Sequence, residues 1–172
     1  MAIADLEPEA AEQAVDTLVK AGLVDGVRPV RLTHPLVQAA ITDDLPASAR
    51  AIAHRRALMV LQAEAAPDDA LIVHALNGEP DGDAETVALL RRTGERARLS
   101  GLPETAVSHL KRALAEPPDS GSRPDVVAEL GRAEVRAGQF EPGLRHLDES
   151  LTGLDDLDRR VDVHRDRAFA AF

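Results

Sequence analysis

The residues of this chain that could carry metal or acid–base chemistry include six histidines spread along the sequence. No two of them have the spacing of the His-Glu-x-x-His zinc motif, so a metal site would require histidines from distant segments to converge. Two of them, His109 and His146, occupy the same position of an internal repeat, which favours a structural role. We therefore predict that the chain binds no metal. The full set is His34, His54, His74, His109, His146 and His164.

Neighbouring carboxylates form a second set that could act as acid and base or as calcium ligands. Those at 43–44 and 68–69 fall at the ends of expected helices, where carboxylates ordinarily cap backbone N–H groups. The acidic run at 155–158 lacks the glycine and the distal glutamate of a calcium loop. No serine stands in a nucleophile-elbow motif, and cysteine is absent. We predict that the chain is not an enzyme.

The composition favours closely packed helices. The chain has 172 residues, of which 44% are hydrophobic but only 2% aromatic, so its core has to be built mainly from Ala, Leu and Val. A β-sandwich ordinarily relies on β-branched and aromatic residues, whereas Ala and Leu are strong helix formers. The sequence therefore predicts an all-α fold.

The charge and the hydropathy pattern restrict the partners. A formal net charge of −10 opposes binding to a polyanion, so we predict no direct contact with nucleic acid. There is no apolar run of membrane-spanning length and no basic-then-apolar signal sequence at the start. We expect a cytoplasmic protein that does not bind membranes.

The first part of the chain predicts short elements with clear joints. Residues 8–24 have a helical apolar stripe that Gly22 ends, and residues 27–34 alternate as a short strand would. Helix, turn and strand together resemble the end of a winged-helix module. Further helices are expected from 35 and from 48, separated by Leu45-Pro46, because the residue before proline avoids the α region.

The second part of the chain repeats itself. Residues 89–114 align with 126–151 at an offset of 37, as from Gly94 to Gly131. The period of tetratricopeptide repeats is about 34 residues, and the loop before position 126 can hold the difference. Each unit reads as helix, tight turn at glycine, helix, and such units need neighbours to bury their apolar faces. Residues 155–172 begin a further helix, and we expect the chain to be cut within the array.

Several motifs in this order resemble the central region of one family. They are Ala21-Gly22-Leu23, His34-Pro35-Leu36, Leu45-Pro46, Arg50, His54, and the stretch from Gly101 to Pro118. The set is similar to that of the large ATP-binding, MalT-like LuxR-type transcriptional regulators of actinobacteria. In that family a winged-helix module at the end of the ATPase region leads into helical repeats. The resemblance covers nearly the whole chain.

The resemblance implies two modules and excludes two others. Residues 1–46 would be the winged-helix-like remnant of the ATPase region, and residues 47–172 a tetratricopeptide-like repeat domain, an α-solenoid truncated at its C-terminus. The chain has no G-x-x-x-x-G-K-[ST] motif, so we predict no cofactor here, with ATP expected only in an upstream domain. The family's C-terminal DNA-binding helix-turn-helix is also absent.

The inner face of the repeats is the candidate binding surface. Tetratricopeptide arrays bind partners on the concave side, which the first helix of each unit lines. Arginine there suits carboxylates, phosphates or acidic peptides, because its fork binds two oxygens. The alternative is that these charges only solvate a helix face, because Arg91 and Glu95 have the i,i+4 spacing of an ion pair within one helix. The candidate residues are Arg91, Glu95, Arg98, Arg132 and Arg136.

The resemblance implies a regulatory interaction segment. It would sense an effector or a partner protein and relay that state to ATPase and DNA-binding domains outside this chain. The alternative is a free-standing tetratricopeptide-like adaptor that only scaffolds a partner. Exposed repeat ends would also allow the chain to form homo-oligomers.

Overall fold

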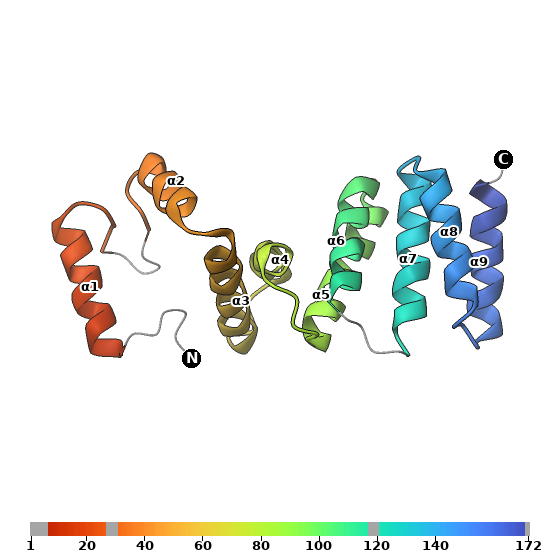
Figure 1. Ribbon diagram of the computed structural model, residues 1–172, viewed down its shortest axis with the longest axis horizontal. Coiled ribbons are helices and arrows are strands. Elements are labelled where there is room, and N and C mark those ends of the chain that lie inside the picture. The colour runs from red at the N-terminus through yellow and green to blue at the C-terminus, as the bar shows by residue number, and fades with distance from the viewer. Residues whose placement is uncertain (1–6, 27–30, 117–120, 171–172) are drawn as a thin grey trace. The chain divides into compact units, whose positions relative to one another are not determined.

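The computed structural model describes residues 7–26, 31–116 and 121–170, and this part of the chain is built from α-helices (Figure 1). The predicted all-α class is confirmed. The helices are α1 (Pro8–Lys20), α2 (Pro35–Asp44), α3 (Ala47–Ala63), α4 (Asp68–Asn77), α5 (Ala84–Leu99), α6 (Pro103–Ala115), α7 (Arg123–Arg136), α8 (Phe140–Leu151) and α9 (Leu157–Ala170).

Internal contacts divide the chain into two compact units. The first contains Met1–Ala66 with Asn77–Glu79, and the second contains Pro67–Leu76 with Pro80–Phe172. Helix α3 therefore groups with α1 and α2. The boundary between 46 and 47 that the motifs predict lies inside the first unit. It separates two expected modules, which the division by contacts does not test, so it stays a prediction.

The first unit has the joints that the sequence predicts. Helix α1 ends in a turn at Gly22, whose φ is +70°, and the N–H of Leu23 donates to the Leu18 carbonyl. Of the expected strand, residues 27–30 lie outside the described residues. The described part forms a single antiparallel bridge between Val24 and Leu32 instead of a strand, and the Thr33 hydroxyl donates to the Gly22 carbonyl at 2.7 Å.

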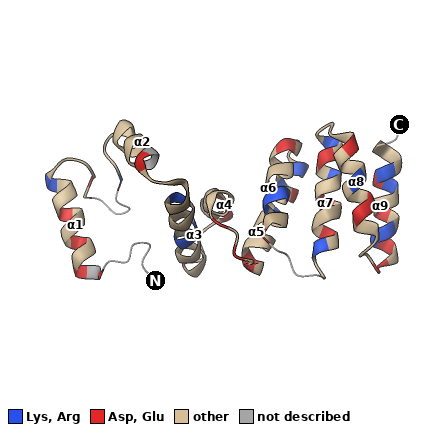
Figure 2. Ribbon diagram, in the orientation of Figure 1, with Lys and Arg blue, Asp and Glu red and all other residues tan. Residues whose placement is uncertain are grey.

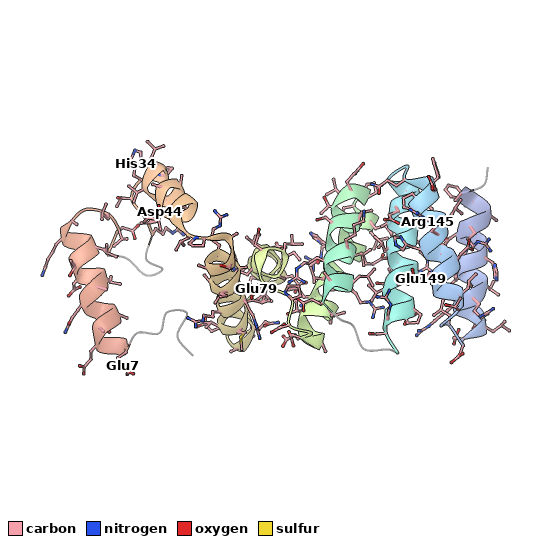
Figure 3. The ribbon with its side chains drawn as sticks, viewed as in Figure 1. Glu7, His34, Asp44, Glu79, Arg145 and Glu149 are labelled. Atoms are coloured by element: carbon pink, nitrogen blue, oxygen red, sulfur yellow. The ribbon has the colours of Figure 1, made fainter. Side chains whose placement is uncertain are left out.

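Helix α2 is bounded by the two proline joints. His34 caps its start, because the N–H of Leu36 donates to His34 Nδ1 at 3.1 Å, and Pro35 takes the first helical position (Figure 3). Leu45, the residue before Pro46, adopts extended backbone and ends the helix. The His-Pro and Leu-Pro pairs thus act as helix boundaries, as expected.

The second unit contains two helical hairpins, α5–α6 and α7–α8, followed by α9 (Figure 1). Both hairpins turn at a glycine with the same backbone conformation, φ +74° at Gly101 and φ +75° at Gly138. The N–H after each glycine returns to a carbonyl five residues earlier, from Leu102 to Ala97 and from Gln139 to Glu134. Glycine adopts this left-handed conformation at low cost, which explains its presence in both turns.

The core of the second unit follows the repeat. One cluster lies between the two hairpins, and the other lies between α7, α8 and α9. Ala, Leu and Val fill both, as the composition requires. The buried members of the first are Ala97, Ala106, Val107, Leu110, Leu130 and Ala133. Those of the second are Ala128, Val135, Leu147, Leu154 and Val163.

Candidate functional site

The candidate site is a groove of about 400 Å³ lined mainly by α5, α7 and α9. These are the first helices of the two hairpins and the helix that follows them. Lys or Arg positions and Asp or Glu positions both occur along the ribbons of α7 and α9 (Figure 2). The arginines of the groove are Arg98, Arg132, Arg136 and Arg165, and its carboxylates are Glu95, Glu129, Asp162 and Asp166.

Each carboxylate of the groove is paired with an arginine. On α5, Arg98 holds both oxygens of Glu95 at 2.7 and 2.6 Å. On α9, Arg165 Nη2 lies 2.8 Å from an oxygen of Asp162.

The other two pairs connect different helices. Arg91 of α5 reaches both oxygens of Glu129 on α7, at 3.0 and 2.6 Å. Arg132 of α7 donates from Nε to Asp166 of α9. These two charge-assisted contacts connect α5 to α7 and α7 to α9 along the groove.

Arg136 is the exception among these arginines. It is exposed, it lines the groove, and it makes no ion pair or side-chain hydrogen bond with the residues that the structure describes. Arg91 pairs with Glu129, and the other three carboxylates pair with Arg98, Arg132 and Arg165. All four carboxylates therefore have a partner other than Arg136. The groove therefore carries one positive charge that its own carboxylates do not neutralise.

The charges of the groove influence one another across the helices. The hydrogen bond from Arg98 lowers the pKa of Glu95, burial opposes this, and the charges of Arg98 and then Arg132 lower it further. The pKa of Arg98 is raised by its bond to Glu95, with a further contribution from the charge of Asp166 on α9. Glu95 and Arg98 therefore both stay ionised near neutral pH.

A smaller hollow of about 200 Å³ continues the groove toward the end of α9. It shares Arg98, Arg132, Arg136, Arg165 and Asp166 with the main groove and adds two apolar side chains, Phe169 and the largely buried Val135. Phe169 is 70% exposed. The unpaired arginine thus lies where the polar groove meets an apolar patch.

Four of the five candidate residues from the sequence line this groove, namely Glu95, Arg98, Arg132 and Arg136. Arg91 does not line it but pairs with Glu129, which does. The expected i,i+4 pair of Arg91 with Glu95 does not form, because Glu95 binds Arg98 one turn onward.

Sequence reasoning missed the contribution of α9. The repeat pattern does not mark Arg165, Asp166 or Phe169, because residues 155–172 contain only the start of a further unit. One signal was present: Asp166 follows Glu129 at the same offset of 37 that relates the two hairpins. In the structure both carboxylates face the groove and accept from an arginine of the preceding first helix.

Two buried glutamates lie outside the groove. Glu116 is 1% exposed and accepts from the N–H groups of Asp81 and Gly82, both at 2.9 Å, and from Arg112. It ties the loop before α5 to the end of α6. Because all its contacts are made within the fold, we assign it a structural role.

The second buried glutamate, Glu134, is 0% exposed and lies 2.6 Å from His146 Nδ1. Its other oxygen faces Lys111 Nζ at 3.5 Å without hydrogen-bond geometry. The histidine of the first hairpin, His109, has no such carboxylate: burial lowers its pKa, and the Thr93 carbonyl opposes the shift. The two repeat-equivalent histidines are thus packed differently.

No three His, Asp or Glu side chains converge as metal ligands in the described ranges. Across those same ranges, no helix is both long and apolar enough to cross a membrane. Comparison of the chain with protein-family models, curated proteins and solved structures gave no significant match.

Proposed function

We propose that this chain is a regulatory interaction segment that binds a partner or effector in the groove along α5, α7 and α9. The observation that carries the proposal is Arg136, an exposed arginine left unpaired in a groove whose other charges are matched. Arginine binds carboxylate and phosphate oxygens bidentately, and here no internal ion pair has to break first.

The position of the groove supports a regulatory role. It touches both hairpins and α9, and two of its ion pairs, Arg91–Glu129 and Arg132–Asp166, join successive first helices. A ligand that binds more tightly to one arrangement of these helices shifts their equilibrium toward it. This is how a binding event in the groove would be passed along the chain.

The wider context that we propose is a MalT-like, LuxR-type ATP-binding transcriptional regulator. The ordered motifs between Ala21 and Pro118 support it. In this proposal residues 1–46 belong to a winged-helix-like module and residues 47–172 to a tetratricopeptide-like repeat domain. The chain would relay its state to ATPase and DNA-binding domains of the longer protein. Sequencing the reading frame on both sides tests this context by the presence or absence of a P-loop and a helix-turn-helix.

The adaptor alternative uses the same groove. A tetratricopeptide-like scaffold would also bind through an unpaired arginine on its first helices, and it would need no ATPase. Finding no P-loop and no helix-turn-helix in the surrounding reading frame would favour the adaptor and contradict the regulator.

The binding proposal itself is tested by affinity capture from a lysate of the source organism. The wild-type chain is immobilised beside Arg136→Gln and Arg145→Gln variants. Arg145 lies on α8, is exposed, and makes no ion pair with the described residues (Figure 3). It therefore matches Arg136 in residue type and exposure but does not line the groove.

We expect at least one protein or metabolite to be retained by the wild-type and Arg145→Gln chains and lost from Arg136→Gln. Equal retention by all three chains would contradict a binding role for the groove.

A further inference from the structure

We infer that the ligand of the groove is an extended segment of a partner protein that carries a carboxylate next to an apolar side chain. This rests on the proposed function and names the ligand class of the same groove. It follows from the sign and number of the charges, the apolar patch beside them, and the openness of the groove.

The charge pattern selects a ligand with an isolated negative group. Arg136 offers one unneutralised guanidinium, whereas Glu95, Glu129, Asp162 and Asp166 remain as fixed negative charges on the same walls. A dense polyanion such as a nucleic acid or a nucleoside triphosphate would meet all four carboxylates, in a chain whose net charge is already −10. A single carboxylate can reach Arg136 without that repulsion.

The carboxylates of the groove have acceptor capacity left. Each ionised carboxylate has about four lone-pair positions, and its arginine uses one or two of them. The rest can accept hydrogen bonds from donors of a ligand. The backbone of an extended peptide provides such N–H groups at regular intervals, whereas a small organic acid provides few.

The apolar patch defines what must stand beside the negative group. Phe169 is 70% exposed and lines the smaller hollow with Val135 and Arg136. Covering an exposed aromatic ring removes apolar surface from water, which favours binding. A ligand with an apolar side chain adjacent to its carboxylate would cover Phe169 while the carboxylate binds Arg136.

The form of the groove favours a chain over a compact molecule. The two hollows share Arg98, Arg132 and Arg136 and form one open channel across three helices. Pockets for small molecules ordinarily enclose 70–90% of the ligand surface, and this groove is open to solvent. An extended peptide can follow the channel and place side chains in both hollows.

The test uses a phage-displayed library of random dodecapeptides selected on the immobilised full chain. The most enriched peptide is synthesised with a fluorophore, together with a form in which each Asp or Glu is replaced by its amide. Affinity is measured by fluorescence anisotropy for the wild-type chain and for Arg136→Gln, Phe169→Ala and Arg145→Gln. Thermal unfolding of each variant is measured as a control, to check that substitution of these exposed residues leaves the fold intact.

We expect enriched peptides to contain Asp or Glu adjacent to a large apolar residue. Arg136→Gln and the amide peptide should each lower affinity about tenfold or more, as loss of a charge-assisted pair would, while Arg145→Gln changes it little. Phe169→Ala should lower it by a smaller factor.

Three results would overturn the inference, and they differ in what they say of the proposed function. Enriched peptides that lack acidic residues but still need Arg136 would contradict the ligand class and leave the groove as a binding site. Peptides whose affinity is unchanged by every groove substitution would contradict both the ligand class and the binding role of the groove. No enrichment, together with retention of a small acid in the lysate capture, would replace the peptide with a metabolite.

Discussion

The α5–α6 and α7–α8 hairpins share one backbone design but differ in the contacts inside it. Both turn at a glycine near φ +75°, and both place a glycine where the two helices cross. At the position of Ala97 in the first hairpin the second has Glu134, a buried carboxylate that binds His146. His109, the equivalent of His146, is instead partly desolvated, with no hydrogen bond at its Nδ1.

The difference shows which properties come from the repeat and which come from individual residues. Glycines and leucines at the repeat positions determine that a hairpin forms and where it turns. The contact of one buried carboxylate with one histidine then joins the two helices of the second hairpin at a position where the first hairpin has Ala97.

The largest expected effect comes from breaking that pair. His146→Leu would leave Glu134 buried with only Lys111 nearby, and we expect it to destabilise the fold by about 3 kcal/mol. A Glu134→Leu/His146→Leu double variant should recover most of this, because a buried pair of polar groups can often be replaced by well-packed apolar residues at little cost. Urea unfolding of the single and double variants measures both values.

Leucine at position 109 is the matched control in the first hairpin. We expect His109→Leu to change stability much less than His146→Leu, since no carboxylate is left behind. Equal losses at 109 and 146 would show that the Glu134 pair is not what distinguishes the hairpins.

The next effect concerns the glycines at the helix crossings. A Cβ at Gly131 would lie 2.8 Å from Leu147 Cγ and 2.9 Å from the Gly143 carbonyl oxygen, whereas a Cβ at Gly94 would meet only side-chain atoms, the nearest being Leu110 Cγ at 3.1 Å. Overpacking of this kind costs about 1–3 kcal/mol. We expect Gly131→Ala to lower the free energy of unfolding by about 2 kcal/mol.

Gly94→Ala should be close to neutral, because alanine's higher helix propensity, about 1 kcal/mol, offsets a contact that the leucine can relieve. Chemical denaturation of the two variants gives the comparison. A loss at Gly94 as large as that at Gly131 would mean that both crossings are equally tight.

The turns should behave alike in the two hairpins. A side chain at Gly101 or Gly138 would meet nothing within 4 Å, so alanine there adds only backbone strain. The left-handed conformation costs a non-glycine residue about 1–2 kcal/mol. We expect Gly101→Ala and Gly138→Ala to lower stability equally, by about 1 kcal/mol, in thermal or denaturant unfolding. Clearly unequal losses would contradict the shared turn.

The smallest expected effect is a pH dependence from the first hairpin. Burial lowers the pKa of His109 below the ordinary value of 6.5, so the folded state takes up its proton less readily than the unfolded state. Stability from this residue is present above pH 6.5 and is lost as pH falls through that value toward the folded pKa. His109→Gln should flatten the slope of unfolding free energy in the pH range just below 6.5. An unchanged slope would assign it to other groups.

The hairpins and most of the groove could be predicted from the sequence, for a physical reason. Helical periodicity, a glycine at each turn and a repeated spacing are local signals, and they place Arg98 and Arg132 on corresponding helix faces. The joints at Pro35 and Pro46 were equally local, because proline restricts its own neighbourhood.

What could not be predicted depends on contacts between distant residues. From the sequence alone, Glu134 resembles a solvent-exposed residue on the surface of a helix. Only the packing of α6, α7 and α8 shows that it is fully buried. The partner of Arg132 is on α9, and nothing local in the sequence distinguishes Asp166 from a surface carboxylate. In the described part of the expected strand only the Val24–Leu32 bridge forms, and strand pairing too depends on a distant partner.

The central claim is that ligands bind along α5, α7 and α9, and amide hydrogen exchange of the full chain tests it most directly. The chain is compared with and without a saturating amount of the enriched library peptide. The account predicts added protection in α5, α7 and α9, centred on the segment around Arg136, and little change at the solvent-facing amides of α8. Protection confined to α8 or to the first unit, or protection that survives Arg136→Gln at the same peptide concentration, would contradict it.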